Sequence, residues 1–282
     1  MHTTASDGGV APAGVVELAE RKGLRAVAVT DHDTTGGIAE AVSAGRGRRV
    51  EVVPGVELSV HGGELGALHI VGLWVDSRNP DLESRLGDMV RGREERGRRM
   101  VARLAELGCP LDLDEVRRLA GGEVIGRPHF ARALVHRGYV GSMREAFSCF
   151  LGRGKPAYMD RERMHAREAI GLIRRAGGVA VLAHPGLIKA SPKELEEGIS
   201  VLRGQGLGGV EVYYPGHAPS DVERLSEVCR RFGLAPSGGT DFHGDVKPEI
   251  ELGGIAVPAE VLDPLRSMAG RPPRRVFMNN PG

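Results

Sequence analysis

The first quarter of the chain alternates between amphipathic stretches and short apolar runs. Residues 12–23 place Val15, Leu18 and Ala19 on one helical face. The run RAVAVT follows at residues 25–30 and is typical of a short buried strand. Because runs typical of strands keep alternating with stretches typical of helices, the pattern predicts a parallel sheet with helices packed outside it.

The pattern changes after Asp76, where the apolar runs disappear and helical periodicity continues. We therefore predict a main domain formed by residues 1–76 and 159–282, with residues 77–158 inserted as a small helical subdomain. The helices expected in the insertion cover residues 82–107, 112–119, 128–137 and 143–150.

Runs typical of strands return after the insertion. They occur at residues 179–185, 209–215 and 234–244, and each follows a stretch with helical periodicity. Several such runs joined by helices favour a (β/α) barrel, and an open doubly wound sheet is the alternative.

The composition is that of an ordinary globular protein. The 282 residues are 41% hydrophobic and 27% charged, with a formal net charge of +1. So small a charge provides no global field for nucleic acid or a membrane, and affinity for phosphate must come from local clusters. No apolar run approaches the ~18 residues of a membrane span, and the three cysteines form no CxxC pair. We expect a cytoplasmic protein with no membrane association and no stable protein partner.

Histidines and carboxylates stand at or near the ends of five apolar runs. Carboxyl ends of parallel strands meet at one edge of a sheet, where active sites are built. One histidine at a strand end is more often structural, and one aspartate is often a helix N-cap. Both explanations become strained for five runs at once, because carboxylates crowded at an apolar barrel mouth need a counter-charge. The residues concerned are Asp31, His32, Glu57, His69, His184, Asp241 and His243.

A metal centre answers this need for positive charge. Imidazole nitrogens mixed with carboxylates are ligands for Zn, Mn or Fe, and the carboxylate of Glu57 can bridge two ions. Asp241 and His243 are two residues apart, so we expect both side chains on the same side of a strand, facing one cavity.

Several motifs occur in an order that resembles the PHP family, the polymerase and histidinol phosphatase domain. They are HTTASDG at residues 2–8, TDHD at 30–33, PGVELS at 54–59, LAHPG at 182–186 and GGTDFHG at 238–244. The insertion, with IGRPHFARAL and GKPAY, resembles the branch that contains 3′,5′-nucleoside bisphosphate phosphatases and the 5′-3′ exoribonuclease RNase AM.

The resemblance implies a distorted (β/α)7 barrel, similar to a TIM barrel, with a trinuclear metal centre. Mn is the metal it implies first, with Fe or Zn as alternatives. By motif, the first ion takes His2, Glu57 and Asp241; the second takes Glu57, His69 and His184; the third takes Asp7, His32 and His243.

One departure from the family pattern concerns the start of the sequence. The family motif begins with a strand that ends in H-x-H, whereas here Met1 stands at the middle position and His2 at the last. We therefore expect a truncated first strand, an open seam in the barrel and a first ion that lacks one ligand and binds weakly.

The proposed metal centre also indicates which residues take part in catalysis and in substrate binding. A metal-activated water attacks phosphorus, and Asp31 or His243 handles protons. A substrate with two phosphates needs a second anion site, and arginine suits it because its planar fork matches phosphate oxygens. The candidates are Arg93, Arg96 and Arg99, three apart on one predicted helix, with Arg127 and His129 near another helix start. The alternative is that these arginines form a solvated helix face.

These features predict a metal-dependent phosphoesterase. Its expected substrate is the 3′-phosphate of a nucleoside 3′,5′-bisphosphate, or short RNA trimmed from its 5′ end. A phosphatase for another small phosphomonoester, such as histidinol phosphate, is the alternative, although that substrate has no second phosphate for the arginines. A non-catalytic or editing PHP module is the alternative of another class.

Overall fold

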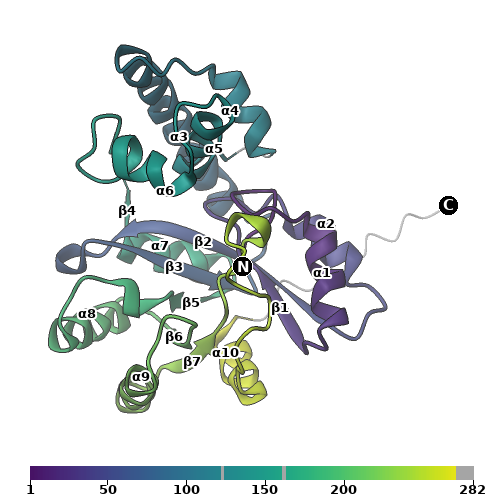
Figure 1. Ribbon diagram of the computed structural model, residues 1–282. Helices are drawn as coiled ribbons and strands as arrows, with labels where there is room; N and C mark the ends of the chain where they lie inside the picture. Colours follow the sequence, from purple (N-terminus) through teal and green to yellow (C-terminus); the bar gives the residue numbers. More distant parts are fainter. Residues whose placement is uncertain (122–123, 161–162, 271–282) are drawn as a thin grey trace.

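The computed structural model describes residues 1–121, 124–160 and 163–270. A curled sheet forms the centre, with helices along its outer side and a separate group of helices above it (Figure 1). The strands are β1 (Ala26–Val29), β2 (Glu51–His61), β3 (Ala67–Leu73), β4 (Met164–His165), β5 (Val179–Leu182), β6 (Gly209–Tyr213) and β7 (Ala235–Gly238).

The sheet is mixed, so the expectation of a parallel sheet is wrong at one strand. The order is β1-β2-β3-β5-β6-β7, with β4 paired to β2 outside this path. β3 runs antiparallel to both β2 and β5. The short connection through Gly63–Leu65 explains this direction, since two antiparallel strands need only a tight turn whereas parallel strands need a long crossover.

The strands β1 and β7 form the two edges of the curled sheet, and no pairing between them occurs within the described residues. Met1 and His2 lie between the carboxyl ends of these edges. The Thr30 amide donates to the Met1 carbonyl (3.0 Å), and the His2 amide donates to the Phe242 carbonyl (2.9 Å). The curled sheet with its outer helices has the form of a distorted TIM-like barrel, as predicted.

The helices begin and end close to where sequence periodicity placed them. The expected helix over residues 143–150 divides into a short α-helix and a π-helix, Phe147–Leu151, and α10 was not anticipated. The α-helices are α1 (Pro12–Arg21), α2 (Ile38–Ala44), α3 (Pro80–Glu106), α4 (Leu113–Ala120), α5 (Arg127–His136), α6 (Met143–Ala146), α7 (Ala166–Arg175), α8 (Pro192–Gly204), α9 (Pro219–Phe232) and α10 (Leu262–Met268).

The second half of α3 and the helices α4 to α6 share a hydrophobic core of their own, whereas Leu82, Leu86 and Met89 in the first half of α3 pack in the core around the sheet. Phe130 and Leu134 of α5 are fully buried in it. Gly97 lets α3 pack closely, because a Cβ at this position would lie 2.7 Å from Cδ1 of Ile125. The second half of α3 and the helices α4 to α6 are thus held together by their own apolar contacts.

Within the described ranges, no helix is both long and apolar enough to cross a membrane.

Candidate metal centre

The predicted ligands meet where the parallel strands of the sheet have their carboxyl ends. His32 follows β1, Glu57 lies in β2, and His184 follows β5. His69 is near the beginning of β3, but because β3 is antiparallel its beginning lies beside the carboxyl ends of its neighbours. The Ala183 amide accordingly donates to the His69 carbonyl (3.1 Å).

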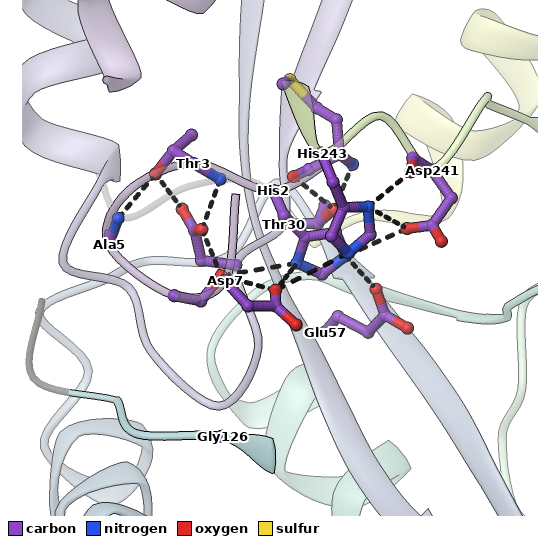
Figure 2. A network of polar contacts seen from close by, with 12 residues as sticks. His2, Thr3, Ala5, Asp7, Thr30, Glu57, Gly126, Asp241 and His243 are labelled. Atoms are coloured by element: carbon purple, nitrogen blue, oxygen red, sulfur yellow. Dashed lines mark hydrogen bonds and ion pairs between the residues drawn. The ribbon is translucent and has the colours of Figure 1, made fainter. Parts of the chain in front are cut away.

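Glu57 lies at the centre of these side chains. Its Oε2 is 2.9 Å from Nε2 of His2, and its Oε1 is 2.6 Å from Nδ1 of His69 and 3.2 Å from Nε2 of His184. The carboxylate therefore contacts histidines on both sides, as a bridging ligand requires. Figure 2 shows Glu57 and Asp241 converging on the His2 ring.

The structure brings together all three sets implied by the motifs. Within the first set, Nε2 of His2 is 3.1 Å from Oδ1 of Asp241. The second set is closed by 3.2 Å between Nδ1 of His69 and Nε2 of His184. The third set, Asp7, His32 and His243, has ligand atoms within 4.8 Å of one another and of His2. His2 therefore adjoins two of the three sets.

Asp241 and His243 reach the centre by a different route from the one expected. β7 ends at Gly238, so neither residue belongs to the strand. Asp241 has φ 54° and His184 has φ 30°, both in the left-handed region that non-glycine residues rarely adopt. Turns with strained backbone, rather than strand alternation, therefore orient Asp241 and His184.

Burial and the neighbouring charges shift the pKa values of the histidines and carboxylates in the site. Burial lowers the pKa of His2, but its contacts with Asp241 and Glu57 outweigh burial and raise the pKa to about 10. Burial, together with the charge of His2, lowers the pKa of His32 to about 3. Burial raises the pKa of Asp7, but the neighbouring histidines more than reverse this and hold it below its usual range. The carboxylates are thus ionised among histidines that do not all carry a proton.

The donor set suits a divalent cation. Nδ1 of His32 is buried and has no hydrogen-bond partner among the described residues, which is costly unless a ligand completes it. Imidazole nitrogens and carboxylate oxygens in this mixture are ligands for borderline divalent ions. We conclude that these residues form a site suited to divalent metal ions.

A hollow of about 320 Å³ lies beside the metal centre and reaches the helical insertion. His32 and His69 form one part of its lining, while Arg93, Arg96 and Arg127 form another. Three predicted arginines therefore share a cavity with candidate metal ligands.

Two other predicted substrate residues lie elsewhere. Arg99 is exposed and is not among the described residues that line the hollow. Six residues at about 100° each carry it about 240° around α3 from Arg93, so the expected shared face does not extend to Arg99. His129 is 1% exposed, and its Nδ1 accepts a hydrogen bond from the Gly126 amide (3.0 Å).

Arg93 is held by a buried carboxylate. Its Nε donates to Oδ2 of Asp33 (2.9 Å) and its Nη2 contacts the same atom. Asp33 also accepts from the Ser59 amide (2.9 Å). This pair joins α3 of the insertion to the loop after β1, so the geometry of the arginine depends on the barrel.

Arg163 and Glu211 are among the polar residues of the site that were missed from the sequence. Arg163 also lines the hollow. Glu211 of β6 accepts a hydrogen bond from the strained His184 amide (2.6 Å), and burial raises its pKa to about 7. A carboxylate inside the apolar run GVEVY was the available signal for Glu211, whereas Arg163 stood out in no pattern.

Several known proteins are similar to this chain in sequence and in fold. The PHP domain model matches residues 1–113. A 3′,5′-nucleoside bisphosphate phosphatase of Chromobacterium violaceum is 38% identical over 86% of this chain and 85% of its own length. The 5′-3′ exoribonuclease Rnm of Escherichia coli is 36% identical over 89% of this chain and 86% of its own.

A solved structure agrees with these relatives. A structure described as a metal-dependent phosphoesterase from Bifidobacterium adolescentis superposes with a TM-score of 0.86 at 31% identity, covering 95% of this chain and 94% of that one. The motifs, the fold and these similarities together show that the chain belongs to the PHP domain family.

Proposed function

We propose that this protein is a metal-dependent phosphoesterase. It removes the 3′-phosphate of nucleoside 3′,5′-bisphosphates, trims short RNA from its 5′ end, or does both. The observation that carries the proposal is the shared hollow, in which candidate metal ligands and buried arginines line one cavity. A phosphate ester with a second phosphate matches that pairing of sites.

Three divalent ions, with Mn the first choice, would be held by the three sets described above. Bound there, such ions supply a hydroxide nucleophile near neutral pH and positive charge for the phosphoryl group. The protein positions these ligands. Glu57 contacts both His2 and His69, and the Glu211 carboxylate accepts a hydrogen bond from the His184 amide. His243 would bind the third ion through Nε2, because its Nδ1 donates to the Asp241 carbonyl (2.6 Å) and is not free for proton transfer.

The arginines of the hollow would receive the second phosphate. Arg93 is fixed by Asp33, and Arg127 lies 5.3 Å from the centre of the Tyr158 ring while donating to the Leu151 carbonyl (3.2 Å). Fixed guanidinium groups bind phosphate with little loss of side-chain entropy. The names of the relatives, a bisphosphate phosphatase and an exoribonuclease, support a substrate with more than one phosphate.

Removal of the metal should abolish activity, and its return should restore it. We expect protein treated with a chelator to release no phosphate from adenosine 3′,5′-bisphosphate, and protein reloaded with Mn to recover. Histidinol phosphate and a 5′-phosphorylated oligoribonucleotide serve as comparison substrates. Inactivity of the Mn-loaded protein on both the bisphosphate and the oligoribonucleotide would contradict the proposal.

Arg127→Ala should weaken binding of the second phosphate. We expect KM for the bisphosphate to rise about 10- to 100-fold, the value of one or two charge-assisted hydrogen bonds, with a smaller change in kcat. A 3′-monophosphate substrate should lose little, because it has no second phosphate. Arg132→Ala, on the same helix, is the control; equal losses on both substrates would argue against this role for Arg127.

A further inference from the structure

One buried carboxylate at the centre is not among the candidate metal ligands. Asp31 is 1% exposed and precedes His32 directly. Its Oδ1 accepts from the Thr3 amide (2.7 Å) and from the Ser6 hydroxyl (2.6 Å), and its Oδ2 accepts from the Thr3 hydroxyl (2.8 Å). Three short hydrogen bonds to one carboxylate, all from one loop, indicate a structural link.

The loop that Asp31 holds connects two candidate ligands. His2 precedes it and Asp7 lies near its end, and Figure 2 shows Asp7 beside the His2 ring with Thr3 on the other side of the loop. The Ser6 and Gly8 amides both donate to the Thr3 carbonyl (3.1 and 2.9 Å). A Cβ at Gly8 would lie 2.4 Å from the His2 carbonyl oxygen, so the loop has no room for a side chain at this position.

The same loop is also attached to the last ligand segment. The Gly9 amide donates to the His243 carbonyl (2.8 Å), and the rings of His2 and His243 stack with centroids 4.3 Å apart. The position of this loop therefore sets the separation of His2, Asp7 and His243 at once.

We propose that Asp31 is a positioning residue, which clamps residues 3–8 so that His2 and Asp7 meet their ions. The inference rests on the proposed metal centre. It replaces proton transfer as the role of Asp31, because a proton carrier must reach the substrate and Asp31 is not among the described residues that line the hollow. Substitution of a group that orients metal ligands commonly weakens metal binding by about 10- to 100-fold.

The clamp can be broken from either side. Asp31→Ala removes the acceptor, while Thr3→Val combined with Ser6→Ala removes the two hydroxyl donors and leaves the Asp31 carboxylate in place. We expect both proteins to bind Mn about 10- to 100-fold more weakly, with lower metal content and with activity recovered as Mn is raised. Asp31→Asn should lose less, because its amide oxygen still accepts from the Thr3 amide and the Ser6 hydroxyl.

Titration calorimetry and metal analysis of the purified proteins provide the readout, with circular dichroism to establish folding. Ser191→Ala, which removes a hydroxyl that caps α8, is the matched control. Ser6→Ala alone is the milder variant if the double variant does not fold, and it should lower Mn affinity in the same direction. Wild-type metal content in Asp31→Ala, or full Mn affinity in the donor variants, would overturn the clamp.

A role in proton transfer predicts a different pattern. It makes Asp31→Asn as inactive as Asp31→Ala at every Mn concentration, and it leaves the donor variants active. Failure of the wild-type protein to bind Mn would instead contradict the metal centre itself, so the two failures are distinguishable.

Discussion

Glu57→Gln should reduce kcat/KM for the bisphosphate by about 1,000-fold or more, which corresponds to about 4 kcal/mol of transition-state stabilisation. The Glu57 carboxylate contacts His2, His69 and His184 within 3.2 Å. A glutamine has nearly the same shape, but its neutral amide offers one oxygen and cannot balance the charge of two ions. Steady-state kinetics and the metal content of the purified protein measure the loss.

Glu64→Gln is the matched control for this experiment. Glu64 is exposed in the turn between β2 and β3, so its substitution changes net charge equally without touching the centre. We expect this control to retain wild-type kinetics. A Glu57→Gln protein with full metal content and activity within tenfold of wild type would show that Glu57 does not bridge ions.

Phe130→Ala should lower the free energy of unfolding by about 3–5 kcal/mol, the usual cost of emptying a buried phenylalanine site. Phe130 is fully buried in the core shared by α3 to α6, and its ring lies close to Gly97. Urea denaturation followed by circular dichroism gives the change. Since α5 also begins at Arg127, we expect KM for the bisphosphate to rise as well.

Phe150→Ala is the comparison, because Phe150 packs against the same core but is only partly buried. Phe150→Ala should lower the free energy of unfolding by clearly less than Phe130→Ala does. If both substitutions cost the same, or if Phe130→Ala costs less than about 1.5 kcal/mol, the helical core does not have the rigidity that its packing indicates.

Local patterns were reliable guides where one element decides the outcome. The helix expected at residues 82–107 is found at Pro80–Glu106, and the stretch whose periodicity predicts a helix at residues 192–204 is α8, Pro192–Gly204. Apolar periodicity, proline at the first turn and a capping serine act within a few residues. They can therefore be recognised without knowledge of the neighbours.

Strand direction and backbone strain were not predictable in this way. An apolar run such as ALHIVGL is the same sequence whether its neighbours run parallel or antiparallel, and β3 proved antiparallel. The positive φ of Asp241 is imposed by the surrounding turn, while Asp241 itself has no strong preference for it. The roles of Asp31 and Glu211 also depend on partners, Thr3 and His184, that lie far away along the chain.

The sequence by itself determined which residue types stand at the ends of the apolar runs, and so the chemistry available to the site. Only the tertiary structure decided their arrangement: which histidines Glu57 bridges, which arginines reach the hollow, and which carboxylate supports the loop. The physical reason is that ligand identity is a property of single side chains. Ligand geometry instead depends on how the curled sheet and the insertion bring distant segments within hydrogen-bond distance.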